Sequence, residues 1–127
     1  MTENEIARVI VDAAIKVHRI LGAGLLESAY ESAMAHELSA RGLQVARQIG
    51  IPIVYDGIDL GEGFRADLVV EAKVLVELKS LEVVQRVHRK QVLTYLKLGK
   101  YRLGLLINFG VPLVKDEIGR ASCRERV

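Results

Sequence analysis

The sequence predicts a single mixed α/β domain. Three observations support this class: two stretches of helical period in the first forty residues, a change to strand-like patterns over residues 43–80, and a later helix followed by a continuously apolar strand. The chain has 127 residues, half of them apolar, which suits one domain with a substantial core. The expected order is ααβββαβ, a mixed sheet flanked by helices, in which a crossover helix joins the last strand to an antiparallel meander.

Two amphipathic helices are expected at the N-terminus. Residues 5–21 carry apolar side chains at helical spacing, and Thr2 with Glu5 forms a candidate capping box. The glycine-rich triplet at residues 22–24 ends this helix. A second helix is predicted over residues 25–40, with Gly42 as its stop.

The rest of the predicted domain is strand-rich. Residues 43–57 form an irregular strand interrupted by Gly50 and Pro52. Two further strands are expected at 63–70 and 73–80, a helix at 83–98 and a final strand at 101–109. This last strand is apolar at nearly every position, which is typical of a strand buried on both faces.

The charges are unevenly distributed. A net charge of +2 is too small to indicate a nucleic-acid partner by itself. Between Gln85 and Arg102, however, there are several basic residues and no acid, namely Arg86, Arg89, Lys90, Lys97, Lys100 and Arg102. This stretch predicts either a solvated helix face or a surface that contacts phosphates.

Composition also limits the protein class. The sequence contains no apolar run of membrane-spanning length, and its acidic N-terminus does not resemble a secretory signal, so a cytoplasmic location is expected. A single cysteine, Cys123, excludes an internal disulfide framework and a multi-cysteine zinc site.

The last eleven residues, "EIGRASCRERV", differ from the rest of the chain. Their apolar density falls, and three arginines surround the only cysteine. One back-translation of this segment matches a common short-read sequencing adaptor read in frame. We therefore expect residues 1–116 to form the domain and residues 117–127 to be an adaptor-derived tail that replaces the natural C-terminus. Functional residues are sought only in the first segment.

An acid and a lysine interrupt the apolar strand "VLVELKS". Glu77 and Lys79 are two residues apart, so they share one face of that strand. A three-residue turn before the strand pairs Val70 with Val74, and this register places Asp67 directly opposite Glu77. Two carboxylates are therefore expected side by side on one face of the sheet.

Such a pair is repulsive unless a cation or a proton lies between the two groups. Mg²⁺ or Mn²⁺ would satisfy it, because these ions prefer oxygen ligands and commonly use one or two carboxylates. Lys79 could then help to deprotonate the attacking water or neutralise a phosphate. The alternative is a structural network in which Asp67 or Glu77 forms salt bridges with Lys79 and Arg65.

Two more motifs occur in the helical segments. "GLLESAY" places Glu27 three residues after Gly24 and three before Tyr30, and "QVLTY" places Gln91 and Tyr95 one helical turn apart. Together with "FRADLVV" and "VELKS", these motifs resemble the GxxExxY protein family of the PD-(D/E)XK nuclease-like superfamily. The resemblance runs from about residue 6 to residue 116.

The resemblance implies a restriction-endonuclease-like core and a set of active-site residues. The residues at the superfamily's metal-binding positions are Glu27, Asp67 and Glu77, and Lys79 is at its catalytic lysine position. Gln91 and Tyr95 resemble a Q-x-x-x-Y element that lies beside the active site in recombination-type exonucleases. Ala66 replaces the proline of the superfamily's name. The catalytic set is therefore expected to be Lys79, Glu27, Asp67, Glu77, Gln91 and Tyr95.

Several of these residues also have structural interpretations. An acid at position 27 is favoured by the helix dipole whether or not it binds metal. Tyr30 fits simple core packing, and His18 is more typical of a structural histidine than of a metal ligand. Gln91 and Tyr95 fit either substrate contact or support of the sheet.

Two functions are compatible with these motifs. The first is a metal-dependent nuclease that uses Mg²⁺ (or Mn²⁺) to cut phosphodiester bonds in DNA, with the backbone held by Arg86, Arg89, Lys90 and Lys97. The second is a non-catalytic module that binds nucleic acid or protein on the same fold. In either case a homodimer is one way to enlarge the binding surface of so small a core.

Overall fold

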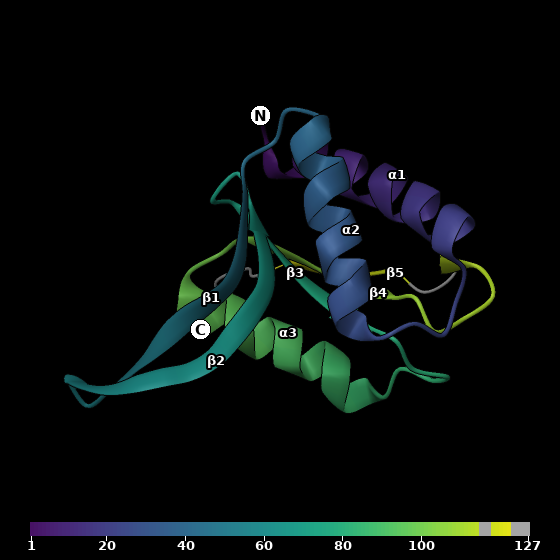
Figure 1. The fold of residues 1–127 in the computed structure, drawn as a ribbon. Coiled ribbons are helices and arrows are strands. Elements are labelled where there is room, and N and C mark those ends of the chain that lie inside the picture. The colour runs from purple at the N-terminus through teal and green to yellow at the C-terminus, as the bar shows by residue number, and fades with distance from the viewer. Residues whose placement is uncertain (115–117, 123–127) are drawn as a thin grey trace.

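A mixed five-stranded sheet forms the centre of the computed structural model, which describes residues 1–114 and 118–122. The strands lie in chain order across the sheet: β1 (Val45–Tyr55), β2 (Ile58–Val70), β3 (Val74–Lys79), β4 (Leu103–Asn108) and β5 (Ile118–Ser122). Helices α1 (Glu3–Leu21) and α2 (Glu27–Ala40) cover one face, and α3 (Arg86–Gly99) covers the other (Figure 1). None of the described helices is long and apolar enough to cross a membrane.

The first helix begins as predicted. Thr2 Oγ1 accepts a hydrogen bond from the Glu5 amide at 3.2 Å, and Glu5 Oε1 accepts one from the Thr2 amide at 3.0 Å. The second helix begins at Glu27 rather than at residue 25, because the Leu25 amide donates to the Tyr30 hydroxyl and the chain is still extended at Leu26. The two helices are thus joined by a short connection that the Tyr30 side chain holds in place.

Aromatic side chains fill the core beneath these two helices. Tyr30 is fully buried and stacks on Phe109 with ring centroids 4.4 Å apart. His18 also stacks on Phe109, and its Nε2 is 2.8 Å from the carbonyl oxygen of Val111. Both Tyr30 and His18 therefore have the structural roles that their sequence contexts favoured.

The pairing of β2 with β3 follows the predicted register. Val70 lies opposite Val74, and the antiparallel pairing continues to Leu68 opposite Val76. Alternate residues pack against opposite helical layers, as the pleat of a strand requires. β3 and β4 are parallel and joined through α3, which confirms the crossover helix.

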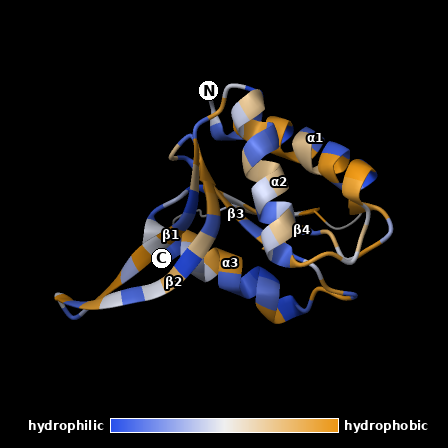
Figure 2. Cartoon of the chain, viewed as in Figure 1, coloured by the Kyte–Doolittle hydropathy of each residue, from blue (hydrophilic) through white to orange (hydrophobic). Residues whose placement is uncertain are grey.

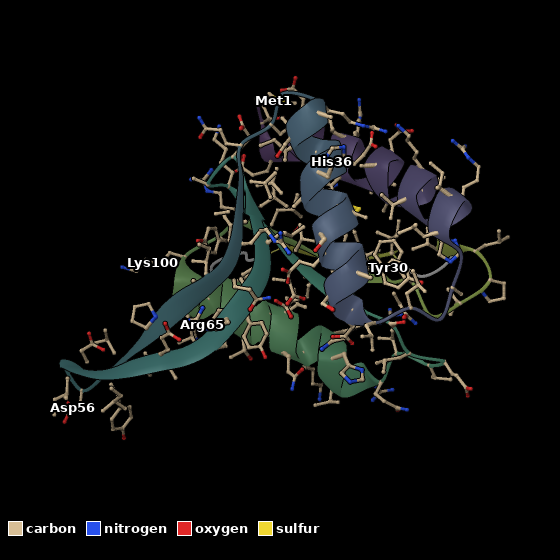
Figure 3. The ribbon with its side chains drawn as sticks, in the orientation of Figure 1. Met1, Tyr30, His36, Asp56, Arg65 and Lys100 are labelled. Atoms are coloured by element: carbon tan, nitrogen blue, oxygen red, sulfur yellow. The ribbon has the colours of Figure 1, made fainter. Side chains whose placement is uncertain are left out.

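Beyond this core, β1 and β2 extend as a two-stranded arm formed by residues 52–63. Figure 1 shows the arm projecting from the body, and Figure 3 labels Asp56 at its tip. The predicted strand at 63–70 was too short, because β2 already begins at Ile58 and continues through Gly61. Figure 2 shows hydrophobic colouring at the exposed end of the arm, where Val54, Ile58 and Leu60 are exposed.

The C-terminal part of the chain differs from prediction in two ways. α3 begins at Arg86 instead of residue 83, with His88 Nδ1 accepting a hydrogen bond from the Gln85 amide at 2.9 Å. A fifth strand, β5, pairs antiparallel with β4, whereas the expected order ended at the strand before it. Strand β5 lies within the predicted adaptor-derived tail, while residues 117 and 123–127 of that tail lie outside the described residues. The origin of the tail stays a prediction.

Candidate active site

Asp67 on β2 and Glu77 on β3 lie side by side where the pairing of these two strands ends. The Asp67 amide donates to Glu77 Oε1 at 3.2 Å, and the Leu78 amide donates to Asp67 Oδ2 at 2.8 Å. Each carboxylate therefore accepts a hydrogen bond from the backbone of the opposite strand. This arrangement confirms the predicted juxtaposition of the two acids.

The surroundings of Asp67 and Glu77 disfavour the ionised form of both carboxyl groups. Glu77 is only 7% exposed, and burial raises its pKa to about 7, with the Asp67 charge acting in the same direction. Burial also raises the pKa of Asp67, while the Leu78 amide and the Lys79 charge oppose that rise. In the described part of the chain, neither acid forms a salt bridge. The pair is thus a site that a cation would stabilise.

Lys79 and Glu27 lie at the edge of this pair. Lys79 is the last residue of β3, is half-buried, and its charge lowers the pKa of both acids. Glu27 is exposed at the start of α2, where its Oε2 accepts a hydrogen bond from the Ser80 amide at 3.4 Å. Its charge also raises the pKa of Glu77, although less than burial and Asp67 do. The structure thus brings Glu27, Asp67, Glu77 and Lys79 to one end of β3.

A shallow groove of about 800 Å³ borders Glu27. Its walls are the connection between α1 and α2, which includes Leu25, the loop that follows β3, with Ser80 and Leu81, and Gly110 from the loop after β4. The groove leaves the Glu27 end of the site open to a ligand much larger than an ion.

A buried asparagine fixes the loop that follows Lys79. Asn108 accepts from the Leu81 amide at 2.9 Å and donates to the Leu81 carbonyl at 2.8 Å. Gly110 packs directly on the same segment, where an added Cβ would overlap the backbone of Leu81. Only glycine fits there, so the backbone beside Lys79 is held in one position.

The two residues of the "QVLTY" motif behave differently from each other. Tyr95 is half-buried and stacks on Phe64 of β2 with centroids 3.8 Å apart. Burial raises the pKa of its hydroxyl, and the charges of Glu77 and Asp67 add to that rise, which places Tyr95 near the acids. Gln91 is exposed one turn earlier, and no hydrogen bond joins it to the acids within the described residues. Its role stays a prediction.

Sequence reasoning missed two residues, Glu31 and Gln48, that connect to the site. Glu31 is buried on α2, and its Oε2 accepts two hydrogen bonds from Arg47 at 3.0 and 3.1 Å. Gln48 Nε2 donates to Glu31 Oε1 and also to Asp67 Oδ1, the latter at 3.3 Å. The four-residue spacing from Glu27 to Glu31 could have indicated Glu31. Nothing in the local sequence distinguishes Gln48.

The basic side chains of α3 are exposed. At 100° per residue, Arg86, Lys90 and Lys97 share one face, about 120° around the helix axis from Val92 and Leu96, the two residues that α3 buries against the sheet. None of these three basic residues forms a salt bridge with the described residues. They form a charged outer surface rather than part of the carboxylate site.

The donor set of the site fits a hard divalent cation. Asp67 and Glu77 offer carboxylate oxygens from rigid strands, and Mg²⁺ commonly binds through only one or two carboxylates, with water completing the shell. Within residues 1–114 and 118–122, no group of three or more His, Cys, Asp or Glu side chains is arranged to hold a metal ion. A cation at this site would therefore rely on the pair, with Glu27 at greater distance or through water.

The comparison with protein families agrees with this geometry. The family model described as the PD-(D/E)XK nuclease superfamily matches residues 4–121. No curated protein and no solved structure matches the chain significantly. The element order and mixed sheet are consistent with the restriction-endonuclease-like fold, whereas membership of the GxxExxY group stays a prediction from the motifs. The chain belongs to the PD-(D/E)XK nuclease superfamily.

Proposed function

We propose that this protein is a metal-dependent nuclease that hydrolyses phosphodiester bonds in DNA. The observation that carries the proposal is the pair formed by half-buried Asp67 and buried Glu77, two adjacent carboxylates without a salt bridge among the described residues, with Lys79 on the same strand as Glu77. Superfamily membership supports nuclease-like chemistry in general.

Each residue of the site has a defined role in this proposal. Asp67 and Glu77 would bind Mg²⁺ (or Mn²⁺), with Glu27 contributing directly or through water. The ion, when bound, supplies Lewis acidity to the phosphate and lowers the pKa of water. Lys79 would orient the attacking water and stabilise the negative charge that grows on the phosphate. Tyr95 and Gln91 would contact the substrate beside the acids.

The outer surface of α3 would contribute to substrate binding. The basic residues of this surface, Arg86, Lys90 and Lys97, would contact backbone phosphates together with exposed Arg89 on an adjacent face of the helix. Such contacts give binding that weakens with salt and depends little on base sequence. The proposed substrate is DNA, and the proposed location of the protein is the cytoplasm.

A second function is favoured by one observation. Because Arg86, Lys90 and Lys97 of α3 are exposed and form no salt bridge with the described residues, the same fold could serve as a non-catalytic module that binds nucleic acid or protein. Such a module would bind DNA equally well with and without EDTA.

The test combines metal binding with cleavage. Mn²⁺ should raise the melting temperature of the full chain, and Mg²⁺ or Mn²⁺ should support DNA cleavage. Both effects should disappear in Glu77→Ala, while Glu3→Gln, at the far end of α1, serves as a matched control. Cleavage that survives in Glu77→Ala would exclude this site. DNA binding without any effect of Mn²⁺ would favour the module.

A further inference from the structure

We infer that Gln48 is a positioning residue of the active site, whose side-chain amide orients the Asp67 carboxylate for metal binding. The inference rests on the proposed function, because it concerns the same ion. It assigns a role to a residue that belongs to none of the motifs in the sequence.

The side-chain amide of Gln48 lies between two carboxylates. Gln48 Nε2 carries two hydrogens and donates one to Glu31 Oε1 and the other to Asp67 Oδ1. Glu31 cannot move aside easily, because it is buried and Arg47 holds its other oxygen through two hydrogen bonds. The amide therefore connects Asp67 to a fixed point on α2.

The backbone of Gln48 is also unusual. Its φ is +50°, a left-handed conformation that a residue with a side chain adopts at a cost of about 1 kcal/mol or more. Its neighbours Arg47 and Ile49 still pair with β2, and its carbonyl accepts from Arg65 Nη1 at 2.8 Å. Figure 3 shows Arg65 where the arm meets the body. The surrounding sheet thus maintains a strained backbone at the residue that contacts Asp67.

The consequence for Asp67 is a fixed carboxylate plane. The Leu78 amide binds Oδ2, and the Gln48 amide binds Oδ1, so both oxygens are oriented before any ion arrives. Each oxygen keeps a further lone pair for a ligand. Partners of this kind, which hold metal ligands in place, typically change metal affinity 10- to 100-fold when they are removed.

Gln48→Gly tests the proposal most cleanly. Glycine accepts a φ of +50° without strain, so the variant should fold, yet it lacks the amide. Calorimetric titration with Mn²⁺ should show an affinity about 10- to 100-fold weaker than in the original protein. The melting temperature in EDTA should change little. Gln44→Met, at an exposed position just before β1, is the matched control and should keep full Mn²⁺ affinity.

Gln48→Met provides a second variant that keeps the length of the side chain but removes its donor. It should lose Mn²⁺ affinity to a similar extent. Unchanged Mn²⁺ affinity in both variants, with normal binding by the unmodified chain, would overturn the role of Gln48 and leave the proposed function intact. Absence of Mn²⁺ binding in the unmodified chain would overturn both.

Discussion

Glu31 and Glu77 are both buried carboxylates, yet their surroundings are opposite. Glu31 receives hydrogen bonds from the Arg47 guanidinium and the Gln48 amide, so its charge has a partner within the fold. Glu77 receives one backbone hydrogen bond and lies beside a second acid. The charge of Lys79 lowers the pKa of Glu77, but the two residues form no salt bridge. One buried acid is compensated inside the protein, and the other is not.

The difference separates a structural carboxylate from one prepared for a ligand. A buried charge without a partner costs free energy, and such a cost persists where the group is needed for binding or catalysis. Replacement of the two acids by glutamine should therefore affect stability in opposite directions. The following predictions test that contrast, from the largest effect to the smallest.

The largest effect should be on cleavage. Glu77→Gln should reduce Mg²⁺-dependent DNA cleavage about 10³-fold, equivalent to about 4 kcal/mol, because the neutral amide cannot hold the cation. Glu31→Gln should reduce it less, because Glu31 acts only through Gln48. Rates measured under single-turnover conditions would compare the two. Equal losses in the two variants would break the distinction between them.

The second effect is a pH dependence of stability in the absence of metal. The pKa of Glu77 is about 7 in the folded protein and near 4.5 when unfolded, so the folded state binds more protons between these values. Stability should therefore fall as the pH rises through this window, by up to about 3 kcal/mol. Glu77→Gln should lack this decline and be the more stable protein at pH 8. Urea unfolding in EDTA at pH 5 and pH 8 measures it, and parallel profiles would contradict the assignment.

The third effect is a loss of stability in Glu31→Gln. The substitution removes the charge that binds Arg47, and we expect a loss of about 2 kcal/mol, moderated because the Arg47 side chain is 46% exposed. Chemical denaturation at pH 7 would measure it. Glu62→Gln, which removes the charge from a salt bridge exposed on both sides, should cost less and serves as the comparison. A stabilised Glu31→Gln variant would show that Glu31 resembles Glu77 after all.

The smallest effect should come from Tyr95→Phe. The stack on Phe64 is retained, so stability should change by less than about 0.5 kcal/mol. If the hydroxyl contacts substrate, cleavage should fall about 10-fold, or about 1.4 kcal/mol. Single-turnover rates with unchanged Mn²⁺ affinity would identify such a contact. An unchanged rate would assign Tyr95 to support of the sheet.

The centre of the site could be predicted because its information is local. Asp67 and Glu77 lie on strands joined by a tight turn, and the register follows from the pairing of Val70 with Val74. Alternation of side chains then places both acids on one face. The capping box of α1 was equally local, since Thr2 and Glu5 are three residues apart.

The outer part of the site could not be predicted because its contacts are distant in sequence. The bond from Gln48 to Asp67 spans 19 residues, and the bond to Glu31 spans 17. The left-handed backbone at Gln48 could not be read from the sequence, because glutamine rarely adopts a positive φ. Strand β5 was missed for a different reason: residues 117–127 were expected to derive from a sequencing adaptor, so no element was sought there.

One oxygen of each central acid is also engaged in holding the edges of two strands together. Asp67 and Glu77 each accept a hydrogen bond from an amide of the opposite strand, so truncation of either would loosen the sheet as well as remove a carboxylate of the proposed metal site. A descendant that abandoned hydrolysis should therefore drift toward asparagine or glutamine at these positions, not toward alanine. A relative without metal binding would then keep both hydrogen bonds between the strands, and with them the local structure of the site.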